Sequence, residues 1–113
     1  MSIRLQRIGS EMQKALSQII RDLKDYRITE MVSVTGVEVS KDLEFAKVYV
    51  SIYGDSDKVQ STFEGLLASS GYIRKELTKH FKDIRHTPQV RFMLDTSMEY
   101  AEKINKLIDD VKK

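Results

Sequence analysis

The fold is decided by the segment Ala68-Ser69-Ser70-Gly71-Tyr72-Ile73-Arg74-Lys75. Apolar residues recur at helical spacing before it and again beyond it, at Val59, Phe63, Leu66 and Leu67 and then at Ile73, Leu77, Phe81 and Ile84. Small residues and a glycine interrupt this periodicity. The pattern predicts two helices that meet at a kink, or a helix-turn-helix that joins them.

Two strands are predicted before this helix pair. Residues 31–40 alternate in polarity, and the parity changes at Gly36, which is typical of a β-bulge. The alternative is that both faces are partly buried. Residues 45–53 form the second strand, with one apolar face made of Ala46, Val48, Val50 and Ile52. The short connection at residues 41–44 predicts an antiparallel hairpin.

Three further elements flank this core. Residues 3–24 have the periodicity of an amphipathic helix, and residues 88–94 alternate as a strand. Thr96 and Glu99 are spaced as a capping box for a last helix, whose apolar stripe runs from Met98 to Val111. The predicted order is α-β-β-α-α-β-α. With 113 residues and no linker or repeat, residues 1–113 are expected to form one domain.

The net charge of +2 conceals separate charged segments. Residues 1–27 carry +3, residues 28–71 carry −4, residues 72–91 carry +4 and residues 92–113 carry −1. If folding brings the two basic segments together, the protein has a polarised face. The alternative is that each segment is a solvated helix face. On the first helix the polar stripe is basic, although Glu11 and Lys14 could form a local ion pair.

Phe45 and Tyr49 lie on the second face of the second strand, together with Tyr53. RNA bases stack on aromatic residues of a sheet in some modules. Packing against cross-strand neighbours is the favoured interpretation, because aromatic residues are common in strands for that reason.

The sequence carries no motif of an enzyme or a metal site. It has no cysteine, and no P-loop, H-E-x-x-H or G-x-G-x-x-G motif. His80 is expected to be a partly buried structural residue and His86 a polar loop residue. We therefore expect no catalysis, no metal and no cofactor. No signal-peptide pattern and no apolar run long enough for a membrane occur, so we expect a soluble intracellular protein. Nothing in the sequence demands a dimer, so we expect a monomer.

The order α-β-β-α-α-β matches the KH arrangement in which a helix and a strand precede a β-α-α-β core. KH domains clamp RNA through a G-x-x-G loop, and no two glycines here are three apart. The chain resembles the ribosome-binding factor A family in four motifs in register, which cover essentially the whole chain. These are Val37-Glu38-Val39-Ser40 with Asp42-Leu43, Ala46-Lys47-Val48-Tyr49-Val50, Ser70-Gly71-Tyr72-Ile73-Arg74, and Ile84-Arg85-His86-Thr87-Pro88 with Phe92, Asp95 and Ser97.

The resemblance implies an α+β, type II KH-like domain with helices packed on a three-stranded sheet. The family replaces the G-x-x-G loop with a helix-kink-helix of pattern Ala-x-Gly, and here Ser69 and Gly71 occupy that kink. The structural interpretation is that small residues let the helices turn. The functional one is that Gly71 lets RNA approach the backbone, and the structural interpretation is favoured for Ser69.

The resemblance further implies a cytoplasmic assembly factor that binds immature 30S subunits and 16S rRNA. It would assist late maturation, including 5′-end processing, and support growth in the cold. The predicted RNA-binding residues are Arg4, Arg7, Lys14, Arg21, Arg74, Lys75, Lys79, Lys82 and Arg85. Two alternatives stay open: a generic KH-like RNA-binding protein or chaperone, and a protein-interaction adaptor.

Overall fold

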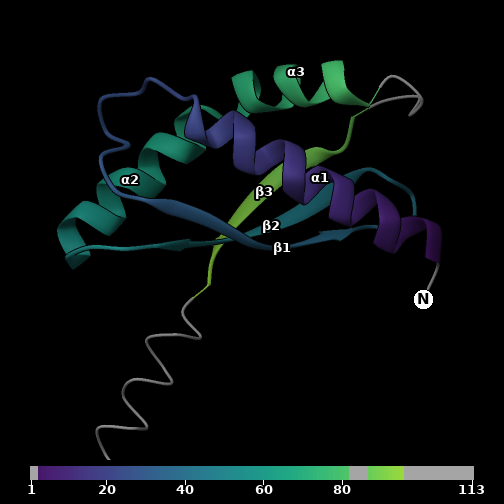
Figure 1. Ribbon diagram of the computed structural model, residues 1–113, viewed down its shortest axis with the longest axis horizontal. Coiled ribbons are helices and arrows are strands. Elements are labelled where there is room, and N and C mark those ends of the chain that lie inside the picture. The colour runs from purple at the N-terminus through teal and green to yellow at the C-terminus, as the bar shows by residue number, and fades with distance from the viewer. Residues whose placement is uncertain (1–2, 82–86, 96–113) are drawn as a thin grey trace, which may run out of the picture.

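The computed structural model describes residues 3–81 and 87–95 of the chain (Figure 1). The described elements follow the predicted order through the third strand. They are α1 (Ile3–Arg21), β1 (Val32–Val39), β2 (Phe45–Ile52), α2 (Ser56–Ala68), α3 (Ser70–His80) and β3 (Gln89–Leu94). The predicted C-terminal helix lies outside the described residues.

The three strands form one mixed sheet in the order β1-β2-β3. Strands β1 and β2 pair antiparallel, which confirms the predicted hairpin, and β2 and β3 pair parallel. The register shifts between Val34 and Gly36, so the predicted bulge is confirmed. Thr35 is the extra residue of the bulge. The valines before and after it therefore pair with β2 residues of the same face, so all of them lie on one face of the sheet. This explains the change of parity in the sequence.

The helices cover one face of the sheet and enclose a single core (Figure 1). From the sheet, the apolar face of β2 points into this core, and from the helices Met12, Leu16, Leu66, Ile73 and Leu77 are fully buried. Helix α1 lies across β1, and α3 packs beside α1. The result is the predicted α+β, KH-like fold, with helices on a three-stranded sheet.

Two contacts hold α1 against the edge strand β1. The Gln13 side-chain amide donates a hydrogen bond to the Val34 carbonyl at 3.0 Å. At Gly9 the helix approaches so closely that a Cβ would lie 3.0 Å from the Val37 carbonyl oxygen. These contacts fix which side of α1 faces the sheet, and hence which side faces solvent.

The loop between α1 and β1 is fastened to α2. A Cβ on Gly65 would lie 2.7 Å from Ile28 Cγ1 and 3.2 Å from Arg27 Cβ, so glycine permits this close approach. The Thr62 hydroxyl donates to the Arg27 carbonyl at 3.4 Å. Within the loop, Arg27 pairs with Asp25 at 2.9 Å.

Three sequence-based expectations require correction. The first helix ends at Arg21, three residues before the predicted end. Helix α3 ends at His80, because Phe81 leaves the helical conformation with φ −122° and ψ 65°, although its side chain still packs against the core. His80 is exposed, since the last turn of α3 extends beyond the buried positions Ile73 and Leu77. None of the helices in the described ranges is both long and apolar enough to cross a bilayer.

Candidate nucleic-acid interface

The four predicted cations of the first basic segment all lie on the exposed side of α1: Arg4, Arg7, Lys14 and Arg21. Among the residues that the structure describes, none of these four takes part in an ion pair, and Glu11 and Lys14 do not pair with each other. The local ion pair that could have neutralised this stripe is therefore absent from the described contacts. The positive charges are available to an external anion.

Three of these cations form a row. Arg7, Lys14 and Arg21 are seven residues apart, so they lie at intervals of about 10.5 Å along nearly the same side of the helix. Such a row is about 21 Å long. A stripe of this length matches an extended polyanion better than a single small anion.

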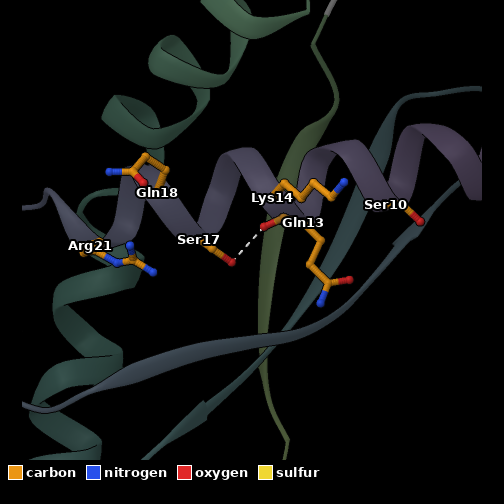
Figure 2. A pocket seen from close by; sticks show the side chains of 6 residues that line it. All are labelled: Ser10, Gln13, Lys14, Ser17, Gln18 and Arg21. Carbon is orange, nitrogen blue, oxygen red and sulfur yellow. Dashed lines mark hydrogen bonds between the residues drawn. The ribbon is translucent and has the colours of Figure 1, made fainter.

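A shallow depression of about 480 Å³ lies beside this row (Figure 2). It is lined by Ser10, Gln13, Lys14, Ser17, Gln18 and Arg21. Three of these side chains are already engaged: Gln13 donates to β1, Ser17 donates to the Gln13 carbonyl at 2.9 Å, and Gln18 donates to the Asp22 carboxylate at 3.2 Å. The lining offers hydroxyl, amide, ammonium and guanidinium groups and no carboxylate. These are the groups that bind phosphate oxygens.

The kink between α2 and α3 falls at Ser69, as predicted. Ser69 is both the C-cap residue of α2 and the N-cap residue of α3, with φ −91° and ψ 2°. Its N–H donates to the carbonyls of Gly65 and Leu66, and its own carbonyl accepts from the Ile73 N–H at 2.9 Å. The second helix therefore begins without a connecting loop, which supports the structural interpretation of Ser69.

Gly71 has a different environment. Apart from its chain neighbours and the backbone of its own helix, no atom of the described residues lies within 4 Å of the position that a Cβ would take there, so internal packing does not require a glycine. Leu67 and Tyr72 beside it are 48% and 56% exposed. At this small, partly apolar surface an external ligand can approach the backbone closely.

The predicted cations of α3 differ in their surroundings. Lys75 is exposed, and Lys79 is exposed but pairs with Glu76 at 3.2 Å. Arg74 donates from Nε and Nη2 to the carbonyl of Thr87 at 3.1 and 2.8 Å. This contact ties α3 to the start of β3, a role that the sequence pattern did not reveal. Binding of RNA by Arg74 stays a prediction. Lys82 and Arg85 lie outside the described residues.

The two basic segments contribute cations to the neighbouring helices α1 and α3, and the second segment also places Arg91 on β3. Because α3 packs beside α1 on the same face of the sheet, the exposed cations of both helices belong to one layer (Figure 1). The acidic segment forms the hairpin and α2 instead. Because α2 lies on the same face of the sheet as α1 and α3, the acidic segment is divided between this helix layer and the hairpin.

The described residues include no group of His, Asp or Glu side chains that could hold a metal ion. Hydrogen bonds from the Arg27 side chain and backbone to the Asp25 carboxylate lower the pKa of Asp25 to about 2. The same pair raises the pKa of Arg27. This is a structural ion pair in the α1–β1 loop and not an acid–base pair in a cleft.

A family model described as "Ribosome-binding factor A" matches residues 4–108. The chain belongs to the ribosome-binding factor A family. Ribosome-binding factor A of Caldanaerobacter subterraneus subsp. tengcongensis is 46% identical over 114 residues, covering 100% of this chain and 93% of the relative. That of Clostridium tetani is 48% identical over 107 residues, covering 94% and 88%.

Solved structures of ribosome-binding factor A proteins share the fold. The solution structure of a candidate member from Thermotoga maritima is 32% identical, with a TM-score of 0.71 over 80% of this chain and 86% of that one. The crystal structure of the Thermus thermophilus protein is 21% identical, with a TM-score of 0.70 over 80% and 93%. A homology model of the Thermus protein has been fitted into a cryo-EM map of a 30S complex, and its TM-score is 0.66.

Proposed function

We propose that the chain is a non-catalytic, monomeric assembly factor that binds immature small ribosomal subunits and their 16S rRNA in the cytoplasm. The observation that carries this proposal is the row of exposed α1 cations beside a depression lined by hydrogen-bond donors. Membership of the ribosome-binding factor A family supports the subunit as the partner. The fitted 30S complex of the Thermus relative supports the same choice.

In this proposal the helices hold the phosphate backbone and do not read sequence. Arg7, Lys14 and Arg21 follow one stretch of backbone along α1, and Arg4 extends the row by one turn. Lys75 adds a contact from α3, and the open backbone at Gly71 lets RNA approach the kink. Specificity then comes from the shape of the folded rRNA, because phosphate contacts position a protein without sequence information.

Binding of this kind assists late maturation by holding an rRNA conformation until neighbouring segments fold. We include 5′-end processing of 16S rRNA and growth in the cold in the proposal. In a strain that lacks the factor, the chain should restore low-temperature growth and reduce the 5′-extended 16S precursor. A variant without the α1 cations Lys14 and Arg21 should do neither at equal expression.

Sucrose-gradient co-sedimentation tests the proposal. The tagged chain should migrate with free small subunits, and nuclease treatment should release it to the top of the gradient. High salt should also release the chain from the small subunits. Migration at the top of the gradient without nuclease would contradict the proposal.

The same gradients separate the alternatives. Association that survives nuclease would indicate a protein-interaction adaptor. Equal affinity for unstructured oligonucleotides and for subunits would indicate a generic RNA-binding protein. The assembly-factor proposal requires a preference for the subunit.

A further inference from the structure

The face of the sheet away from the helices carries its own pattern of side chains. Because Ala46, Val48 and Val50 point into the core, the residues between them on β2 point to the opposite face. The pair Ser33 and Ser51 forms one row of this face, and three further rows follow it. By register they are Gly36, Tyr49 and Met93, then Glu38, Lys47 and Arg91, then Phe45 and Gln89.

Phe45 and Tyr49 lie against neighbouring strands, which confirms the predicted cross-strand packing for these two rings, whereas Tyr53 follows the end of β2 and is exposed. The Arg91 guanidinium carbon lies 4.0 Å from the centre of the Phe45 ring. At the bulge, the Cβ position of Gly36 lies 3.9 Å from Tyr49 Cδ2, an ordinary van der Waals distance, so the Tyr49 ring lies beside β1. Both rings are half-buried, and neither belongs to the hydrophobic core.

Two like charges occupy the register row between those of the two rings. Lys47 and Arg91 are register neighbours on β2 and β3, and both are exposed. Neither takes part in an ion pair among the described residues, although Glu38 is in the same row. Neighbouring like charges on a sheet are unfavourable. A bound anion between the two rings would relieve this repulsion.

We propose that this open face is a second binding surface, for single-stranded RNA. A base stacks on Tyr49, another stacks at the Phe45–Arg91 pair, and Lys47 and Arg91 hold the phosphates between them. The rings are four residues apart, about 13 Å along the strand. Stacked bases are only about 3.4 Å apart. The spacing therefore fits splayed, unpaired bases and excludes a continuous base stack.

This inference rests on the proposed function, in which rRNA is the partner, and it adds a second surface on the opposite side of the molecule from the helix layer. RNA is favoured over an apolar protein partner because two exposed cations, Lys47 and Arg91, share the register row between those of the rings. A factor with two such surfaces could hold an unpaired rRNA segment on the sheet while α1 grips a folded region.

A tryptophan reporter tests the stacking directly, because the chain contains no tryptophan. Tyr49→Trp places one fluorophore on the sheet, and Tyr26→Trp places one at a residue that is 85% exposed in the α1–β1 loop. Titration with an unstructured ten-nucleotide RNA should quench the emission of the Tyr49→Trp chain and leave that of the Tyr26→Trp control nearly unchanged. Unchanged emission of the Tyr49→Trp chain while the RNA binds would overturn the proposal.

Affinity measurements on the same oligonucleotide keep the test independent of the reporter. Tyr49→Phe retains a ring and should bind as the parent does, whereas Tyr49→Ala should bind about tenfold more weakly. Circular dichroism shows whether each variant is folded. Equal affinity of folded Tyr49→Ala and the parent chain would contradict the proposal.

Failure of this inference is distinguishable from failure of the proposed function. If Lys14→Ala/Arg21→Ala weakens subunit binding and Tyr49→Ala does not, the sheet proposal fails and the assembly-factor proposal stands. If Tyr49→Ala weakens an association that survives nuclease, the face binds protein and the RNA proposal is overturned. If the chain binds neither subunits nor RNA, both proposals fail.

Discussion

Replacing Arg74 by alanine should destabilise the fold. The change removes two charge-assisted hydrogen bonds to the carbonyl of Thr87, a residue that is 6% exposed. Leaving a buried acceptor without its donors costs about 1–3 kcal/mol. Both bonds reach one oxygen and Arg74 itself is exposed, so we expect about 1–2 kcal/mol. With an unfolding entropy of about 0.24 kcal/mol/K for a chain of this length, the melting temperature should fall by about 4–8 °C.

Differential scanning calorimetry of three chains measures this effect. Lys75→Ala is the matched control, because Lys75 is the neighbouring exposed cation with none of the described hydrogen bonds or ion pairs. Its melting temperature should change by no more than about 2 °C. In subunit binding, Lys75→Ala should lower affinity. If Arg74→Ala kept the parent melting temperature and lost as much subunit affinity as Lys75→Ala, the positioning role of Arg74 would be refuted.

Three further predictions concern the other close contacts. Gly65→Ala should lower the free energy of unfolding, measured with denaturant, by about 1–3 kcal/mol, because the new Cβ would lie 2.7 Å from Ile28 Cγ1. Unchanged stability would show that the α1–β1 loop moves aside without cost. Gly71→Ala should be neutral or stabilise the fold by up to about 1 kcal/mol, yet weaken RNA binding if RNA approaches the backbone there. The Asp25–Arg27 pair should stabilise the chain fully above pH 3.8, the ordinary pKa of Asp25, and lose that effect as pH falls through about 2. The stability difference between the parent and Asp25→Asn, measured by urea unfolding from pH 7 downwards, should shrink in that range, and a constant difference would contradict the pKa assignment.

Most of the fold could be predicted from local patterns. The bulge at Gly36, the hairpin and the kink at Ser69 each leave a signal in the nearby sequence, as a change of parity, a short polar turn or an interruption of helical spacing. The end of α3 could not be predicted in this way. Apolar spacing continues to Ile84, and it contains no information on the departure of Phe81 from the helix.

The positions of the charged residues in the candidate site could be predicted from the sequence, whereas their hydrogen-bond partners could not. Charge counting by segment identified the cations of α1, and amphipathic spacing assigned them correctly to the solvent side. The bond between Arg74 and the Thr87 carbonyl joins residues on different elements, so it depends on how α3 meets β3. Sequence spacing could not distinguish this arginine from the exposed Lys75 next to it.

The central claim is that exposed α1 cations bind the phosphates of small-subunit rRNA. The salt dependence of subunit affinity tests it most directly, measured for the parent, for Lys14→Ala/Arg21→Ala, and for Lys41→Ala/Lys58→Ala, which removes two charges from the acidic segment. Each lost phosphate contact should reduce the slope of log affinity against log salt by about 0.7–0.9. The slope should fall by about 1.4–1.8 for the α1 pair and stay at the parent value for the control pair. Equal slopes for all three chains would contradict the claim.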